Sequence, residues 1–329
     1  MRVWPIPELE YRPLSDIQDQ RDVALVFSRA AREAVARPLT RLNVVSSVEP
    51  QTATEAEWQQ LAAACVGEVV YSVGGGLATD AAKYIAAQRE LPLVCIPTAL
   101  SVDAFFTWAS GVRVAGCVTY IATKPPDLVV IDAAVIAAAP PSVRAAGIGD
   151  VLSIATGSWD WRYAHERGAN PVDAPYDAGA DRIAAALLSE AMECAPAAGA
   201  GDEAGLRQLV DCLVPEVQLC NLIGHSRPEE GSEHYFAYAV ESVLGHGLPH
   251  GDLVGPGILM MAGVQGQDVA PLREALVACH TPLDTIARDI VERTLRDLPR
   301  YCREHGLPHG IAHDLTRDMI ERAVAALTV

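Results

Sequence analysis

The stretch EVVYSVGGGLATDAAKY, residues 68–84, passes from an apolar run into three glycines and then into a segment with helical spacing. Gly74, Gly75 and Gly76 carry no side chains, so backbone N–H groups at the positive end of the following helix are open to a pyrophosphate. Three consecutive glycines alone also fit a tight turn that binds nothing. Their place between a strand and a helix favours ligand binding, because the carboxyl ends of parallel strands hold ligands.

The apolar runs on either side of this stretch predict a parallel sheet. Each run is short, rich in β-branched residues and ends in turn-forming residues, and helix-like segments such as ATDAAKYIAAQ (78–88) separate the runs. Runs of this kind are typical of strands buried on both faces, so we expect an α/β N-terminal domain. The expected strands are DVALVFS (22–28), LNVVSS (42–47), EVVYSVGGG (68–76), LPLVCIPT (91–98) and DLVVID (127–132).

The second part of the chain has a different pattern. From about residue 141 the strand-like runs disappear and apolar residues recur at helical spacing, as in EHYFAYAVESVLG (233–245). At 329 residues the chain exceeds the size at which one core keeps growing, which favours two domains. We predict an α/β domain over residues 1–143 and an all-helical domain over residues 144–329, connected near PPSVRAAG (140–147).

The composition limits the kinds of partner. The formal net charge is −17, so we expect no binding to nucleic acid and no binding to a membrane surface. Lys83 and Lys124 are the two lysines, so an anionic substrate needs a local pocket built from arginine. The N-terminal residues lack a signal-like pattern, and the eight dispersed cysteines show no CxxC pair. We expect a cytoplasmic protein with free thiols.

Polar side chains follow the strand at 91–98. Thr98, Ser101 and Asp103 in VCIPTALSVDAF are expected at the edge of the sheet where the glycines also lie. Hydroxyl groups at that edge can hydrogen-bond a bound ligand, and Asp103 can face a reacting alcohol. For Thr98 and Ser101, helix capping is an equally good interpretation.

One acid and two histidines in the helical part suggest a metal site. Asp150 lies in the apolar segment AGIGDVL, and a buried carboxylate is uncommon unless it is paired or bound to metal. His234 lies in the first turn of an apolar helix, and His250 precedes the next one. Two imidazoles and a carboxylate that converge from three helices form a site typical of a catalytic divalent metal.

The pentapeptide GLPHG occurs twice, at residues 247–251 and 306–310. His250 in the first copy has His234 as a partner and an apolar helix behind it. His309 in the second copy follows a charged helix and is expected to have a structural or solvated role.

Six ordered segments resemble one enzyme superfamily: SVGGGLATDAAKY, IPTALSVDA, TKPPDLVVID, AGIGDVL, GSEHYFAYAVE and LPHGDLVGPGILMM. This superfamily joins glycerol dehydrogenases, sn-glycerol-1-phosphate dehydrogenases, iron-containing alcohol dehydrogenases and dehydroquinate synthases. GSEH followed by LPHG, together with KPP, looks most similar to the glycerol-1-phosphate dehydrogenase branch. The resemblance implies an N-terminal domain that binds NAD or NADP, a helical domain that binds a divalent metal and a small-molecule substrate, and an active site between them.

The resemblance also assigns roles to individual residues. Gly74, Gly75 and Gly76 would hold the pyrophosphate, with Asp80 near the nicotinamide and Thr98 and Ser101 along the cofactor cleft. Asp150, His234 and His250 would bind the metal, and with Asp103 beside the substrate they make up the expected catalytic site. One carboxylate and two imidazoles suit Zn²⁺, Fe²⁺ or Ni²⁺, and we expect Zn²⁺.

The expected activity is that of a metal-dependent NAD(P)-linked dehydrogenase, which interconverts a small polyol or polyol phosphate and its ketone. The alternative is a dehydroquinate synthase-like sugar-phosphate cyclase that uses NAD transiently, although a chain with two lysines lacks the lysine contacts of that enzyme. Phosphate-handling branches usually have a histidine where this chain has Tyr238, and Arg227 is a possible substitute for it. Glu49 leaves the choice between NAD and NADP open. Apolar helix faces suggest a homo-oligomer.

Overall fold

The computed structural model describes residues 3–328, in which six parallel strands form one sheet in the order β1-β8-β5-β4-β2-β3. The parallel α/β sheet predicted from the apolar runs is confirmed. The strands are β1 (Glu8–Tyr11), β2 (Asp19–Phe27), β3 (Leu42–Val48), β4 (Val69–Gly74), β5 (Leu93–Pro97) and β8 (Leu128–Ile131). The pattern ELEY did not predict β1, because four alternating residues with two acids carry little strand signal. β1 pairs with β8 at one edge.

Two features of the strands differ from the prediction. β3 is an edge strand rather than a strand buried on both faces, and Val44 and Val45 are 40% and 46% exposed. A separate antiparallel hairpin joins β6 (Ala109–Val114) to β7 (Cys117–Ala122). Its turn residues Ala115 and Gly116 have positive φ angles of 50° and 80°. A primed hairpin turn requires such angles, and alanine rarely signals them, so the sequence pattern did not reveal the hairpin.

The described chain also contains fourteen α-helices. Three of them precede β8: α1 (Arg29–Val35), α2 (Glu55–Ala64) and α3 (Gly76–Arg89). The others are α4 (Ala133–Ala137), α5 (Pro141–Arg144), α6 (Ile148–Leu152), α7 (Ile154–Glu166), α8 (Ala178–Ala200), α9 (Glu203–Ile223), α10 (Ser232–Leu244), α11 (His250–Gln265), α12 (Ala270–Ala278), α13 (Arg288–Glu304) and α14 (Arg317–Thr328). Within residues 3–328, no helix combines the length and the hydropathy needed to cross a membrane.

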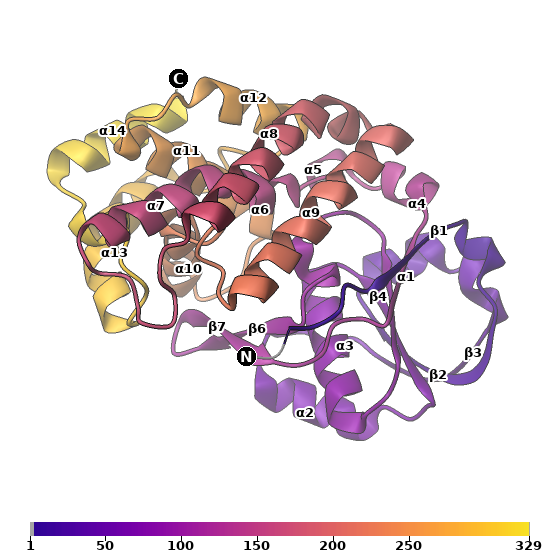
Figure 1. Cartoon of the computed structure of the whole chain (residues 1–329). Helices are drawn as coiled ribbons and strands as arrows, with labels where there is room; N and C mark the ends of the chain where they lie inside the picture. The colour runs from indigo at the N-terminus through magenta and orange to yellow at the C-terminus, as the bar shows by residue number, and fades with distance from the viewer. Residues whose placement is uncertain (1–2, 329) are drawn as a thin grey trace.

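Apolar packing is continuous between the two parts of the chain. One core cluster runs from Trp58 and Leu93 beside the sheet to Leu213 and Leu259 in the helices. A second, smaller cluster packs on the sheet and includes Val23. Figure 1 shows the helical part lying above and to one side of the sheet. The domain boundary near residue 143 stays a prediction.

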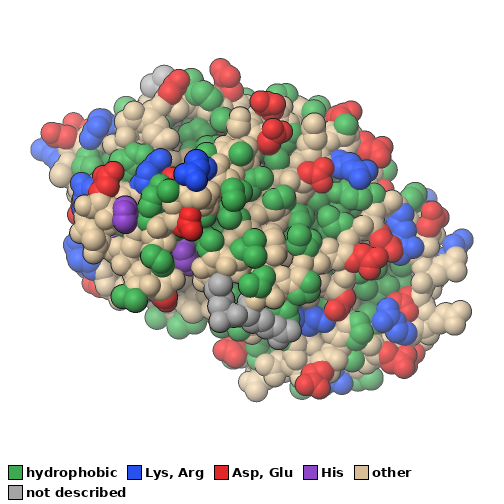
Figure 2. All heavy atoms as spheres, viewed as in Figure 1, with side chains coloured by type: hydrophobic (Ala, Val, Ile, Leu, Met, Phe, Trp, Pro, Cys, Tyr) green, Lys and Arg blue, Asp and Glu red, His purple; other side chains and the backbone are tan. Residues whose placement is uncertain are grey.

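Three helix packings position the candidate site. The short helix α6 packs against α9 and α11, and α10 packs against α11. The first turns of α10 and α11 therefore lie near α6, although these elements are far apart in the sequence. Figure 2 shows acidic and basic side chains interspersed over one face of the molecule, without a broad basic area there.

Candidate active site

A large cavity of about 1630 Å³ lies between the N-terminal part and the helical part. Both parts of the chain contribute to its wall. Among the residues predicted from the sequence, Gly75, Gly76, Asp80, Thr98, Ser101, Asp103 and His250 line it. The structure therefore brings the glycine turn and one of the two candidate histidines to the same space.

The glycines have two different roles in the turn between β4 and α3. Gly74 does not line the large cavity, and a Cβ there would lie 2.8 Å from the Ser28 hydroxyl oxygen at a φ of +148°. Close packing thus requires glycine at this position. A Cβ on Gly75 would lie 3.4 Å from Ser101 Oγ, which is an ordinary contact, so steric packing alone does not require glycine there. Gly75 and Gly76 leave backbone exposed to the cavity at the N-terminus of a 14-residue helix.

Asp80 anchors α3 to the hairpin. One carboxylate oxygen lies 2.8 Å from the Lys83 ammonium, and the other accepts a hydrogen bond from the Gly111 N–H at 3.1 Å. Lys83 is fully buried and also donates to the Ala109 carbonyl. Asp80 compensates the buried Lys83 charge and holds the Gly111 backbone, so it shapes the wall of the cavity as well as facing it.

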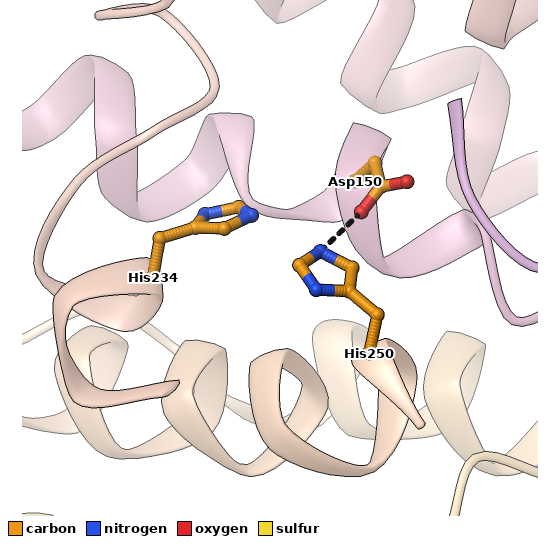
Figure 3. Close-up of side chains that lie close together, drawn as sticks. All are labelled: Asp150, His234 and His250. Carbon is orange, nitrogen blue, oxygen red and sulfur yellow. Dashed lines mark ion pairs between the residues drawn. The ribbon is translucent and has the colours of Figure 1, made fainter. Parts of the chain in front are cut away.

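Asp150, His234 and His250 point toward one another from three helices (Figure 3). One ligand atom from each residue lies within 4.8 Å of the other two. The nearest pair is His250 Nε2 and Asp150 Oδ1 at 3.0 Å. Asp150 Oδ1 is buried and accepts no hydrogen bond, while Oδ2 accepts one from the Asp103 N–H at 2.8 Å. The arrangement leaves an acceptor oxygen and two imidazoles facing a common point.

Glu233 orients the ring of His234. Its Oε1 lies 2.9 Å from His234 Nδ1 and also accepts a hydrogen bond from the Gly231 N–H at 2.6 Å. Burial lowers the pKa of His234, but the hydrogen bond and charge of Glu233 outweigh burial and raise that pKa to about 9. A carboxylate bound to one ring nitrogen leaves the other nitrogen available as a ligand.

A small cavity of about 40 Å³ adjoins these groups, and several acids line it. Its wall is made of Asp103, Tyr120, Asp150, Glu229, Glu230, His234 and His250, with no lysine or arginine among these described residues. Burial, followed by the charge of Asp150, raises the pKa of Asp103. Burial also raises the pKa of Glu229 well above its usual range, with the charges of Asp103 and Asp150 next in importance. This end of the large cavity therefore holds several carboxyl groups whose burial favours their protonated forms.

Arg227, the possible substitute for the missing histidine, lies away from the two cavities, whereas Tyr238 lines the large one. Tyr238 donates a hydrogen bond to Glu230 Oε1 at 2.7 Å, and its oxygen lies 3.2 Å from the Tyr120 oxygen. Arg227 is buried, donates to the Tyr235 oxygen at 3.1 Å and to the His309 carbonyl at 2.8 Å, and lines neither cavity.

The two copies of GLPHG lie in different surroundings. His250 begins α11 and lines both cavities. His309 Nε2 lies 3.3 Å from Asp314 Oδ2, its ring stacks on Tyr163 with centroids 5.8 Å apart, and it lines neither cavity. Of the two histidines, only His250 lies at the candidate site, as its sequence neighbours indicated.

Sequence reasoning missed the acids Glu229 and Glu230. The signal was the pair of glutamates in SRPEEGSEH, only a few residues before His234. A pair of glutamates is usually solvated, and only the fold shows that this pair lines the small cavity.

Part of the chain matches a known protein family, and much of it is similar in sequence to named enzymes. The family described as iron-containing alcohol dehydrogenase matches residues 12–140. The glycerol-1-phosphate dehydrogenase [NAD(P)+] of Methanothrix thermoacetophila is 30% identical over 77% of this chain and 72% of its own length. The enzyme of the same name from Methanosarcina barkeri is 33% identical over 67% of this chain and 61% of its own length.

Solved structures agree in fold along nearly the whole chain. A probable glycerol dehydrogenase from Sinorhizobium meliloti has a TM-score of 0.69 at 20% identity, with 99% of this chain and 98% of that chain covered. The glycerol dehydrogenase of Schizosaccharomyces pombe also has a TM-score of 0.69, at 19% identity, with 100% and 91% covered. The chain belongs to the iron-containing alcohol dehydrogenase family, on the branch of the glycerol-1-phosphate dehydrogenases.

Proposed function

We propose that this protein is a divalent-metal-dependent, NAD(P)-linked dehydrogenase that interconverts a small polyol or polyol phosphate and its ketone. The observation that carries the proposal is the convergence of Asp150, His234 and His250 beside a cavity that is lined by His250 and also by Gly75 and Gly76. The names of the similar glycerol-1-phosphate dehydrogenases support the same class of reaction.

The proposed ligands fit a divalent metal. Asp150 Oδ1 is a buried acceptor that receives no hydrogen bond, and Glu233 holds His234 through Nδ1. A carboxylate with two imidazoles is a common donor set for a catalytic metal that keeps a position open for substrate. The glycine turn fits a dinucleotide, because it presents side-chain-free backbone at a helix N-terminus. A divalent metal held by Asp150, His234 and His250 would supply Lewis acidity toward the substrate oxygen, and a nicotinamide held at the glycine turn would supply the hydride chemistry.

The residues of the chain position and shield the reacting groups. The Asp103 N–H donates a hydrogen bond to Asp150 Oδ2, which connects η3 (Asp103–Phe105) to α6 at the site. The Asp103 carboxyl lines the small cavity and is placed to take up the proton that the substrate hydroxyl loses. The walls of the large cavity align the substrate with the cofactor, which is the main contribution of a protein to hydride transfer.

The activity is tested with purified protein, NADH or NADPH, and a panel of dihydroxyacetone, its phosphate and related ketones. The proposal predicts substrate-dependent loss of NAD(P)H absorbance that a chelator abolishes and added divalent metal restores. Absence of turnover across the panel would argue against a dehydrogenase. Release of inorganic phosphate without net change in NADH would instead support the cyclase alternative.

Gly75→Ala is expected to raise the Kd for NAD(P)H about tenfold. The methyl group would lie 3.4 Å from Ser101 Oγ, so the fold accommodates it, but it would occupy space beside the N-terminus of α3. Fluorescence titration with NADH measures the Kd, and the thermal unfolding temperature should stay close to that of the wild type. Unchanged NAD(P)H affinity would place the pyrophosphate elsewhere.

Finer features complete the proposal. We propose Zn²⁺ as the metal, a homo-oligomer as the assembly and the cytoplasm as the location.

Glu49 bears on the choice between NAD and NADP. Its carboxylate lies 3.2 Å from the Arg29 guanidinium and accepts a hydrogen bond from the Arg29 N–H at 2.9 Å. Light scattering gives the assembly, and the ratio of KM values for NADH and NADPH gives the cofactor preference.

A further inference from the structure

Glu216 on α9 is a carboxylate without a partner. Its side chain is 1% exposed, and neither Oε1 nor Oε2 accepts a hydrogen bond. A buried carboxylate in this state is costly unless a positive group or a proton compensates it. A positively charged ligand bound near Glu216 would supply this compensation.

Such a place lies beside the catalytic end of the large cavity. Cys220 follows Glu216 by one turn of α9, and one atom each of Glu216, Cys220 and Glu229 lie within 4.8 Å of one another. We call these three residues the acidic cluster. Glu229 Oε2 is also buried without a hydrogen bond. Cys220 and Glu229 line the large cavity, and Glu229 also lines the small cavity with Asp150, His234 and His250. The acidic cluster therefore adjoins the proposed metal site through Glu229.

Positive side chains do not offset these charges. Arg113 is the one lysine or arginine among the described residues that line the large cavity, and its guanidinium pairs with Glu241 at 3.0 and 3.1 Å. Arg227 is held by Tyr235 and His309, and Tyr238 donates to Glu230. A phosphate at this end would face buried carboxyl groups and would find no free lysine or arginine to pair with among the described residues that line the two cavities.

We propose that the acidic cluster binds an ammonium group of the substrate, so that the enzyme interconverts an amino alcohol and its aminoketone in preference to a phosphate ester. The inference rests on the proposed function. Glu229 is the contact at the cavity wall, and Glu216 behind it is a positioning residue that adds a second negative charge. An ammonium group has three donors and no acceptor, which matches a cluster that offers free carboxylate oxygens.

A second metal ion is the competing occupant of the acidic cluster, and the thiol disfavours it. Metals bind the thiolate, whereas burial, followed by the charges of Asp103 and Glu230, raises the pKa of the Cys220 thiol. With the thiol neutral, a metal ion would have only Glu216 and Glu229 as ligands in the acidic cluster. An ammonium group can bind there without a deprotonated sulfur.

The test compares 1-amino-3-hydroxypropan-2-one, dihydroxyacetone and dihydroxyacetone phosphate as substrates of the metal-loaded enzyme. The aminoketone should have a kcat/KM about 10- to 100-fold above that of dihydroxyacetone, and the phosphate should have the lowest value. Glu229→Gln and Glu216→Gln should each reduce the ratio of aminoketone to dihydroxyacetone about tenfold or more. Glu203→Gln, an exposed substitution in the first turn of the same helix, should leave that ratio unchanged.

A direct binding measurement separates failure of this inference from failure of the proposed function. Calorimetry with 3-amino-1,2-propanediol on the metal-loaded enzyme should give a Kd that rises about tenfold in Glu229→Gln. Turnover of dihydroxyacetone or its phosphate with no amine preference would overturn the ammonium site and leave the dehydrogenase intact. In another outcome, Glu216→Gln and Cys220→Ser each lose one equivalent of metal while the metal bound by Asp150 is retained. That result would also overturn the ammonium site, in favour of a metal ion in the acidic cluster. If the enzyme turns over none of these substrates, the calorimetric measurement still tests the inference. An equal Kd for the amine in the wild type and in Glu229→Gln would then overturn it.

Discussion

His250→Ala is expected to remove the bound divalent metal and to lower kcat/KM about a thousandfold. A polarising metal supplies several kcal/mol of transition-state stabilisation, and about 4 kcal/mol corresponds to a factor of about 10³. His250 suits this test because it is the most exposed of the three proposed ligands, with its side chain 31% exposed, so its removal leaves the core nearly unchanged. Metal content by mass spectrometry and kcat/KM with the preferred ketone measure the effect.

His309→Ala is the matched control for His250→Ala, because it changes the same residue of the same pentapeptide. His309 packs on Tyr163 and lies beside Asp314, away from both cavities, so metal content and kcat/KM should stay within about twofold of the wild type. Equal losses in the two variants would mean that the first GLPHG has no special role. Retention of metal and activity in His250→Ala would remove His250 from the site.

Asp160→Ala is expected to reduce the free energy of unfolding by about 3–5 kcal/mol, because it breaks a buried polar network. Asp160 is fully buried in α7. It accepts hydrogen bonds from the Ser232 N–H at 2.8 Å, from the Ser232 hydroxyl at 2.5 Å and from the Ile311 N–H at 2.9 Å. Alanine would leave these donors buried and unsatisfied. Chemical denaturation monitored by circular dichroism gives the loss.

The same change should also weaken metal binding, because Ser232 begins the helix that carries His234. Asp160→Asn keeps one acceptor oxygen in place and should lose less stability than Asp160→Ala. A loss below about 1 kcal/mol in Asp160→Ala would show that the network does not support the start of α10.

The sequence predicted most of the sheet because long apolar runs leave few alternatives. β4 and β5 are fully buried, and their sequences read directly as strands. β3 was misjudged because LNVVSSV has the composition of a buried strand, while its exposure is set by its place at the sheet edge. Strand order is a property of the whole fold and is not encoded in any single run.

The residues of the candidate site could be predicted only where they lie within a recognisable sequence motif. Asp150, His234 and His250 were proposed together because their surrounding motifs resemble a known superfamily, and the packing of α6, α10 and α11 brings them within reach of one another. Glu216 and Glu229 had no such motif. Their importance comes from burial and from missing hydrogen-bond partners, which are properties of the folded chain alone.

The most direct test of the account is anomalous diffraction at the metal absorption edge from crystals grown with NAD(P)H. The account predicts one strong peak about 2.0–2.2 Å from an Asp150 oxygen and from one ring nitrogen each of His234 and His250, with the nicotinamide facing it across the cavity. A metal-loaded, active crystal with its anomalous peak away from these three side chains would contradict the account.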